Sequence, residues 1–229
     1  MILVGEGAVY LRAMRHCQSA SLPIDAAISA EPPPPDLLER LGCACRISRD
    51  VNAEWEFVRD VCSDGIVWSL DNRVLLRPPL LGLPGICHFN VHNGLVQRYR
   101  GLPEVGLFLA ILAGETEWGT TLHEIDSGID TGAVFAQKRI QLKPDDTFGT
   151  AMTRAVECCA ELFAEQVSCV CLGETRPIEV DRTASRCFSY RHLDEALCYR
   201  DTPAWHRATD LWPLATRFQR LAAWIVARS

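Results

Sequence analysis

Residues 87–101 read C-H-F-N-V-H-N-G-L-V-Q-R-Y-R-G, and residues 119–132 read G-T-T-L-H-E-I-D-S-G-I-D-T-G. In the first segment, alternate residues differ in polarity, which is typical of a β-strand whose side chains point to opposite faces in turn. The alternation predicts a strand over residues 86–92. Asn90 and His92 are therefore expected on the same face of that strand.

The pair Asn93-Gly94 is a turn signal that ends this predicted strand. Asn90 and His92 should therefore lie near its carboxyl end, where open α/β sheets bind their ligands. An amide next to an imidazole can donate a hydrogen bond to a developing oxyanion and carry a proton to or from a reacting nitrogen.

A carboxylate that could complete such a site is offered by the second segment. It contains Glu124, Asp126 and Asp130, and its Gly128 and Gly132 predict a loop that can bring one of these acids near the imidazole. A carboxylate beside a histidine fixes the orientation of the ring and favours its protonated form, which suits proton transfer near neutral pH.

Four short motifs resemble, in order and spacing, the signature of 10-formyltetrahydrofolate-dependent formyltransferases. The signature consists of Asn-x-His, an Arg-Gly turn, Gly-x-Thr-x-His, and an aliphatic residue followed by Asp-x-Gly. The resemblance covers about the first three quarters of the chain. The matching residues are Phe89-Asn90-Val91-His92, Arg100-Gly101, Gly119-Thr120-Thr121-Leu122-His123 and Gly128-Ile129-Asp130-Thr131-Gly132.

The resemblance implies a role for each matching polar residue. Asn90 and His92 would stabilise the formyl oxyanion and transfer a proton, and Asp130 would orient His92 and an ordered water. Asp130 is chosen among the acids because it matches the position before Thr-Gly. The resemblance also places five residues on the folate side of the site, namely Arg73, Val74, Leu75, His123 and Gly128.

Some of these residues have structural alternatives. Val74 and Leu75 could equally belong to the core, and His123 could contact the Asp130 loop or satisfy a buried backbone group. A zinc or iron site built from His88, His92, His123 and Asp130 is a weaker alternative, because His88 has no counterpart in the family. We expect no metal.

Two departures from the family pattern concern the acceptor. Asn93-Gly94 stands where the family usually has Pro-Ser or Pro-Ala, which changes the turn next to the expected amine. The loop after the first strand reads Gly5-Glu6-Gly7-Ala8-Val9, whereas the glycinamide ribonucleotide branch has Gly-x-Gly-Ser-Asn for phosphate. This difference disfavours a phosphoribosyl substrate.

The order of apolar segments predicts an α/β fold, with a Rossmann-like, mostly parallel sheet and helices on both faces. The four prolines of residues 32–35 mark a stiff connection, and Asn52 is the expected N-cap of a helix. Strands are predicted over residues 1–4, 24–30, 44–48, 66–70, 86–92 and 134–142, and helices from residue 7, over 36–41, 52–61, 102–113 and 147–172.

The last part of the chain differs in character. We expect a catalytic domain over residues 1–180 and a C-terminal extension over 181–229 that packs on it or forms a dimer face. Pro213 is well placed to begin a final helix. The extension is too short for the β-barrel that methionyl-tRNA formyltransferases append.

Composition restricts the partners. The chain has 229 residues and a formal net charge of −6, which argues against nucleic-acid binding by general electrostatics. No apolar run is long enough to cross a bilayer and no secretion signal is recognisable, so a cytoplasmic location is the default. The eleven cysteines include no C-x-x-C pair and are interpreted as reduced, small core residues.

The resemblance therefore implies an N-formyltransferase that moves a formyl group from 10-formyltetrahydrofolate to a primary amine, and the expected acceptor is a nucleotide-linked amino sugar. An aminoacyl or ornithine-type amine is the alternative acceptor. Other classes left open are a nucleotide-cofactor oxidoreductase, suggested only by Gly5-x-Gly7, a folate-binding module, and a formyltetrahydrofolate hydrolase.

Overall fold

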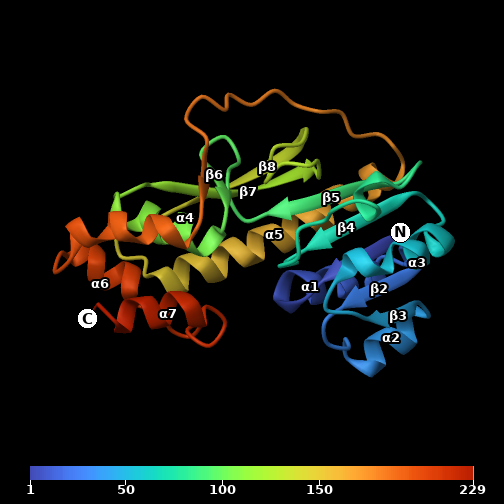
Figure 1. Cartoon of the computed structure of the whole chain (residues 1–229), viewed down its shortest axis with the longest axis horizontal. Helices are drawn as coiled ribbons and strands as arrows, with labels where there is room; N and C mark the ends of the chain where they lie inside the picture. The colour runs from blue at the N-terminus through green and yellow to red at the C-terminus, as the bar shows by residue number, and fades with distance from the viewer. Residues whose placement is uncertain (229) are drawn as a thin grey trace. The chain divides into compact units, whose positions relative to one another are not determined.

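The computed structural model describes residues 1–228 and contains a seven-stranded sheet (Figure 1). The order of its strands is β3-β2-β1-β4-β5-β7-β8. Neighbouring strands from β3 to β5 are parallel, whereas β5 and β7 are antiparallel. The strands are β1 (Ile2–Gly5), β2 (Ala26–Ser29), β3 (Ala44–Ile47), β4 (Ile66–Leu70), β5 (Cys87–His92), β7 (Glu117–Glu124) and β8 (Val134–Gln141).

The chain divides into two compact units. The first contains residues 1–92, 121–137 and 159–179, and the second contains 93–120, 138–158 and the residues from 180 onward. The predicted boundary between a catalytic domain and an extension at residue 180 stays a prediction.

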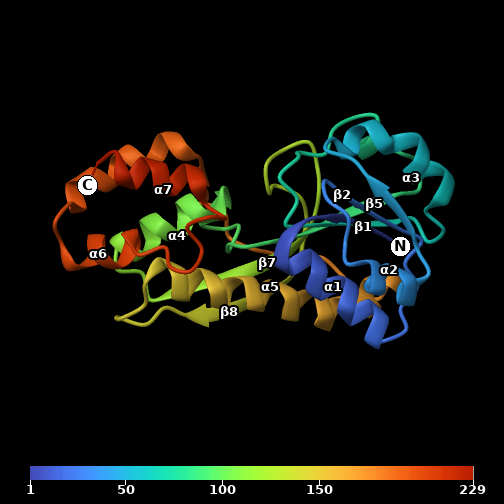
Figure 2. The same cartoon turned by 90° about the horizontal axis from the view of Figure 1, so that it is seen from below.

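Helices cover both faces of the sheet in the first unit. Successive apolar residues of a strand such as β4 point to opposite faces, so each face needs helices to bury it. Val67 of β4 belongs to an apolar cluster that includes Val58 of α3 (Trp55–Val61). Its neighbour Trp68 faces the other way and packs on Phe163 of α5 (Phe148–Cys171), with ring centroids 4.8 Å apart. Figure 2 shows α3 on one side of β1 and β5, and α1 (Gly7–Ser19) on the other. The predicted α/β fold class is confirmed.

The second unit has its own core around α4 (Pro103–Leu112). Phe108 of this helix packs on Trp205 and Trp224, with ring centroids 6.2 and 6.0 Å away. These tryptophans lie on α6 (Pro203–Thr209) and α7 (Gln219–Val226), which follow the 3₁₀ segment η3 (Tyr190–Tyr199). Helices α6 and α7 therefore share a core with α4.

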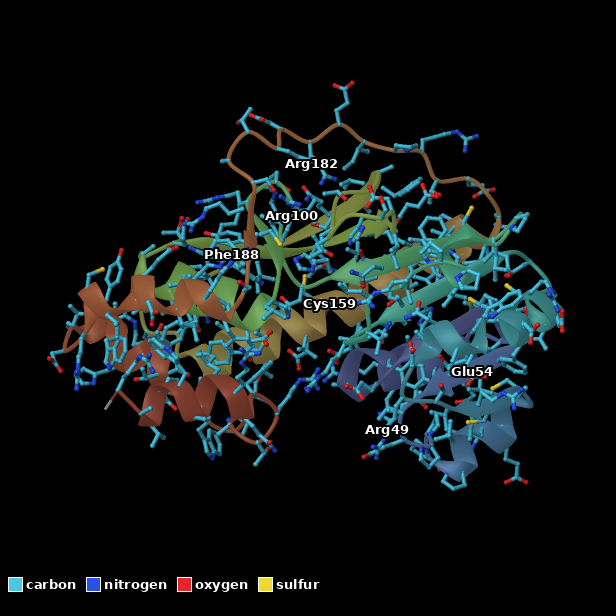
Figure 3. All side chains as sticks on the ribbon, in the orientation of Figure 1. Arg49, Glu54, Arg100, Cys159, Arg182 and Phe188 are labelled. Carbon is cyan, nitrogen blue, oxygen red and sulfur yellow. The ribbon has the colours of Figure 1, made fainter. Side chains whose placement is uncertain are left out.

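The Arg-Gly turn of the sequence motif lies on a small parallel pair of strands, β6 (Tyr99–Gly101) and β9 (Arg186–Phe188). Arg100 and Phe188 are labelled in Figure 3. A Cβ added to Gly101 would lie 2.3 Å from the carbonyl oxygen of Phe188. Glycine is therefore required here by the close approach of the two backbones.

Two predicted helix starts are wrong. The final helix begins at Gln219 rather than at Pro213, because residues 211–218 form a turn in which the amide of Phe218 bonds to the carbonyl of Leu214 and the Phe218 ring packs on Phe148. Asn52 is not an N-cap. Asp50 takes that place at the 3₁₀ turn η1 (Val51–Glu54) by accepting a hydrogen bond from the Asn52 amide at 3.1 Å. The remaining helix, α2 (Pro35–Leu41), begins at the last of the four prolines, one residue before the predicted start.

All eleven cysteines, which lie within the described residues, are free thiols. Cys17, Cys158 and Cys159 are buried, whereas the others are partly or fully exposed. The interpretation as core residues is therefore correct for three positions and wrong for the rest. Within residues 1–228, no helix combines the length and apolar character that crossing a bilayer requires.

Candidate active site

Three polar side chains meet near the carboxyl end of β5. Asn90 is paired with His123 in the antiparallel register of β5 and β7, and His92 is paired with Thr121. Directly paired residues of a sheet place their side chains on the same face. Asn90, His92 and His123 therefore lie on one face, and both histidines are buried, with 6% and 2% of the residue exposed.

The His123 ring fixes the orientation of the Asn90 amide. Nδ1 of His123 lies 2.8 Å from the carbonyl oxygen of Glu124, which can only accept, so Nδ1 carries the proton. Nε2, the other ring nitrogen, lies 3.2 Å from Nδ2 of Asn90 and accepts a hydrogen bond from this amide in the tautomer protonated only at Nδ1. One N–H of the amide is directed to His123, and the second N–H can serve a different acceptor.

Asp130 lies between the two imidazoles. Its Oδ2 atom is 3.5 Å from Nδ1 of His92, and its Oδ1 atom is 3.4 Å from Nε2 of His123. The carboxylate side chain is 12% exposed, so water screens these contacts only in part. The structure thus brings together the amide, imidazole and carboxylate that the sequence motifs predicted.

The loop after β7 holds Asp130 by its own hydrogen bonds. Oδ1 of Asp126 accepts from the Gly128 amide at 3.0 Å and from the Thr131 hydroxyl at 2.6 Å. The Asp126 carboxylate therefore accepts hydrogen bonds from within its own loop. Asp130 adopts a left-handed backbone conformation with φ of 52°, which aspartate tolerates better than most residues and which is frequent at functional sites.

Gly132 lets the loop return against β7. A Cβ added here would lie 1.9 Å from the carbonyl oxygen of Glu124, a backbone atom that cannot move aside. We expect Gly132→Ala to shift the loop and lower kcat about 100-fold, because a displacement of about 1 Å at a reacting group has effects of that size. Steady-state kinetics would measure this loss.

Gly82→Ala is the matched control, because a Cβ added to Gly82 meets no atom within 4 Å. It should leave kcat unchanged. Normal kinetics in a folded Gly132→Ala protein would show that the position of Asp130 does not matter for turnover.

The segment predicted to contact folate is held by Asn52, a contact that sequence reasoning missed. Nδ2 of Asn52 donates to the carbonyl of Leu75 at 3.0 Å, and its Oδ1 accepts from the Arg77 amide at 2.7 Å. Val74 is partly buried against the apolar cluster of the first unit, whereas Leu75 is exposed. Leu75 therefore presents more of its apolar side chain to solvent than Val74 does, and contact of either residue with folate stays a prediction.

Arg73 borders a pocket of about 180 Å³ at the carboxyl ends of β1 and β2. Its Nε atom lies 3.2 Å from Oε1 of Glu6, which follows β1. Ser29 and Arg49 also line this pocket. A carboxylate thus occupies the loop in which the glycinamide ribonucleotide branch binds phosphate.

The other two predicted folate contacts differ in accessibility. Gly128 is exposed, and a Cβ added to it would lie 2.0 Å from Oγ1 of Thr131, so a larger residue would displace the hydroxyl that donates to Asp126. His123 is buried, and both of its ring nitrogens face protein atoms. A direct contact between His123 and folate stays a prediction.

Asn93 stands where the family usually has proline, and its side chain forms hydrogen bonds within the second unit. Its Oδ1 atom accepts from Nε1 of Trp118 at 2.8 Å, and its Nδ2 atom donates to the sulfur of Met152 at 3.3 Å. A proline cannot make these contacts, because it has no side-chain polar group. Both polar groups of the Asn93 side chain are therefore hydrogen-bonded to residues of the second unit.

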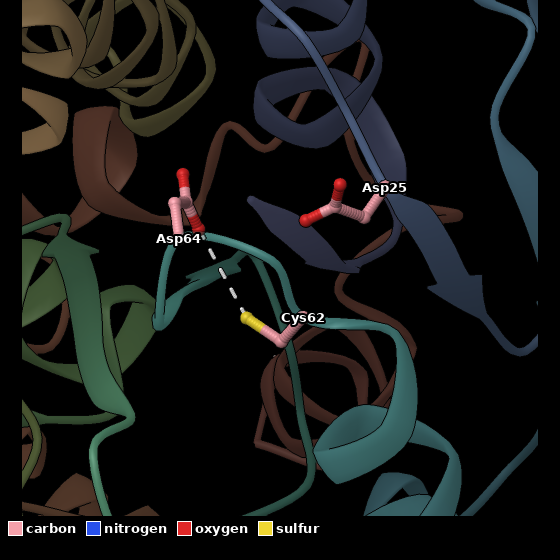
Figure 4. Close-up of side chains that lie close together, drawn as sticks. All are labelled: Asp25, Cys62 and Asp64. Carbon is pink, nitrogen blue, oxygen red and sulfur yellow. Dashed lines mark hydrogen bonds between the residues drawn. The ribbon is translucent and has the colours of Figure 1, made fainter.

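Within residues 1–228, one group of three potential metal ligands has its ligand atoms within 4.8 Å of one another, formed by Asp25, Cys62 and Asp64 (Figure 4). Asp25 accepts hydrogen bonds from the amide and hydroxyl of Ser63, both at 2.9 Å. The group precedes β2 and β4, at the ends of the strands opposite to the site. The alternative site of His88, His92, His123 and Asp130 does not form such a group.

His88 is on the same face of β5 as Asn90, and burial lowers its pKa to about 4 from 6.5. Since the unfolded chain binds this proton more readily, the free energy of unfolding should fall as the pH drops from about 6.5 to about 4, by about 3 kcal/mol in total. Urea unfolding across this range would measure the effect. His88→Leu should remove this part of the pH dependence, and an unchanged slope would contradict the assignment.

Residues 71–167 match the sequence model of the family described as formyl transferase. This segment contains Asn90, His92, His123 and Asp130, and over these residues the match confirms the predicted family and enzyme class, a formyltransferase.

Solved structures with the same fold are formyltransferases of different kinds. The N-formyltransferase from Helicobacter canadensis, in complex with folinic acid and dTDP-3-aminofucose, is 18% identical, with a TM-score of 0.66 over 83% of this chain and 70% of that one. The formyltransferase PseJ from Anoxybacillus kamchatkensis, in complex with UDP-4,6-dideoxy-4-formamido-L-AltNAc and tetrahydrofolate, is 18% identical, with a TM-score of 0.62 over 92% and 96%. Phosphoribosylglycinamide formyltransferase from Streptococcus pneumoniae is 23% identical, with a TM-score of 0.57 over 74% and 97%.

Proposed function

We propose that this chain is an N-formyltransferase that moves the formyl group of 10-formyltetrahydrofolate to the primary amine of a nucleotide-linked amino sugar. The observation that carries the proposal is the convergence of Asn90, His92 and Asp130 within the segment that matches the formyl transferase family. The folate donor is supported by the folinic acid and tetrahydrofolate in the complexes of two structurally similar enzymes.

The acceptor nitrogen attacks the formyl carbon, and the carbonyl oxygen becomes an oxyanion. The Nδ2 group of Asn90 donates one hydrogen bond to His123, and we assign its second N–H to this oxyanion. An amide whose orientation is already fixed needs no reorganisation as the charge develops. His123 is thus a positioning residue for Asn90.

Collapse of the tetrahedral intermediate breaks the bond between the formyl carbon and N10 of the folate. The attacking amine loses a proton and the departing N10 gains one, so the proton must be carried between them. Nδ1 of His92 faces Asp130 at 3.5 Å, and we assign proton transfer to Nε2, the other ring nitrogen. Asp130 orients the ring and an ordered water.

The proposed acceptor is supported by the loop after β1 and by the structurally similar enzymes. Glu6, which is paired with Arg73, precedes α1 in a loop that lacks the Ser-Asn with which the glycinamide ribonucleotide branch binds phosphate. Two of the similar structures hold nucleotide-linked sugars. We therefore propose a nucleotide-linked amino sugar rather than glycinamide ribonucleotide.

The decisive experiment incubates the protein with 10-formyltetrahydrofolate and, separately, dTDP-linked and UDP-linked amino sugars, ornithine, glycinamide ribonucleotide, or no amine. Tetrahydrofolate release is followed together with the mass of the acceptor. We expect release only with an amino sugar, whose mass rises by that of one carbonyl group.

The other outcomes would overturn parts of the proposal. Formylation of ornithine would replace the proposed acceptor, and tetrahydrofolate release without any amine would indicate a hydrolase. A protein that binds no reduced folate would refute the formyl donor.

A further inference from the structure

We propose that His88 is a specificity-determining residue that hydrogen-bonds the pterin ring of the bound folate through its Nε2 atom. The inference rests on the proposed function, because it requires a folate whose formyl group lies at Asn90 and His92. It assigns a residue outside the motifs that carry the family resemblance.

The first observation is a buried nitrogen without a partner. His88 is 2% exposed, and its Nε2 atom has no hydrogen-bond partner among the described residues. Most buried polar groups in proteins are hydrogen-bonded, because leaving one unsatisfied destabilises the fold. A ligand that supplies the missing partner would explain why a polar side chain occupies this position.

The second observation is where the residue lies. His88 precedes Asn90 by two positions on β5, so the two side chains share a face. His88 is also in parallel register with Val67, which belongs to the apolar cluster of the first unit. The same cluster contacts Val74, from the segment predicted to bind folate, and Ile125, whose amide bonds to the His88 carbonyl at 2.7 Å.

The third observation is a match of lengths. Two residues of a β-strand span about 7 Å, which separates the backbone of His88 from that of Asn90. In folate a single methylene joins the bicyclic pterin ring directly to N10, so the ring begins two bonds away from N10. A folate with its formyl group at Asn90 can therefore place the ring beside His88.

The chemistry of both partners is compatible. Burial lowers the pKa of His88 to about 4, so the imidazole is neutral near pH 7. A neutral imidazole offers one donor and one acceptor nitrogen, according to its tautomer. The pterin edge carries both N–H donors and a carbonyl acceptor, so it can satisfy either form of Nε2.

The test measures the affinity for folinic acid by calorimetry in wild type, His88→Leu and His88→Gln, without any amine. We expect His88→Leu to bind about tenfold more weakly, because the pterin loses a buried hydrogen bond. His88→Gln keeps an amide that can bond and should recover part of the affinity. Binding of p-aminobenzoylglutamate, which lacks the pterin ring, should not differ between the variants.

Trp68→Phe is the matched control. It removes another buried nitrogen that has no partner, Nε1 of Trp68, but on the face of the sheet that packs on Phe163. Its folinic acid affinity should equal that of wild type. Equal affinity in a folded His88→Leu protein would overturn the proposal for His88 alone, whereas a wild type that fails to bind folinic acid would refute the proposed function itself.

Discussion

Replacing His92 by alanine is expected to lower kcat for formyl transfer by about 10²- to 10⁴-fold, the usual contribution of a positioned proton carrier. The proton released by the amine would then reach N10 of the folate only through solvent. The His92 ring is 6% exposed and lies 3.5 Å from the Asp130 carboxylate, so bulk water cannot readily replace it. Single-turnover rates with the amine identified in the acceptor panel would measure the loss.

The control for this experiment is His206→Ala. His206 is exposed on α6, and its removal should leave the rate unchanged. Thermal unfolding should show that the His92→Ala protein remains folded. A folded His92→Ala protein that turns over at the wild-type rate would refute the role of the imidazole.

The second large effect is expected from Asn90→Ala, which should lower kcat about 10²- to 10³-fold, as the loss of one oxyanion donor does in other enzymes. The amide acts on a charge that exists only in the transition state. Both kcat and kcat/KM should therefore fall by the same factor.

Ground-state binding offers the check on this interpretation. Folinic acid affinity should change little in Asn90→Ala, because no oxyanion forms without an attacking amine. A large rise in KM with an unchanged kcat would contradict an oxyanion role and indicate that Asn90 only binds substrate.

Local sequence patterns predicted the elements that have a strong periodic signal. The strand over residues 86–92 corresponds to β5, and the predicted helices over 102–113 and 147–172 correspond to α4 and α5 within a residue or two. In these segments, propensity, apolar spacing and end signals agree, so the tertiary structure has nothing to override.

The two wrong helix starts show where local signals fail. Pro213 suits the first turn of a helix, but the packing of Phe218 on Phe148 bends the chain before α7 begins. Asn52 suits an N-cap, but its side chain instead binds the backbone of Leu75 and Arg77, more than twenty residues away. Such long-range contacts leave no trace in a local window of sequence.

The sequence by itself determined that Asn90 and His92 share one face of a strand and lie near its carboxyl end, because the two-residue period of a β-strand is a property of the local backbone. Only the tertiary structure decided that His123 faces Asn90 and that Asp130, which the family resemblance assigned to His92, also contacts His123. Those placements depend on the antiparallel register of β5 and β7 and on the loop closed by Gly132. Both arise from backbone contacts between residues that are distant in the sequence or separated by a turn, so no local pattern of residues can specify them.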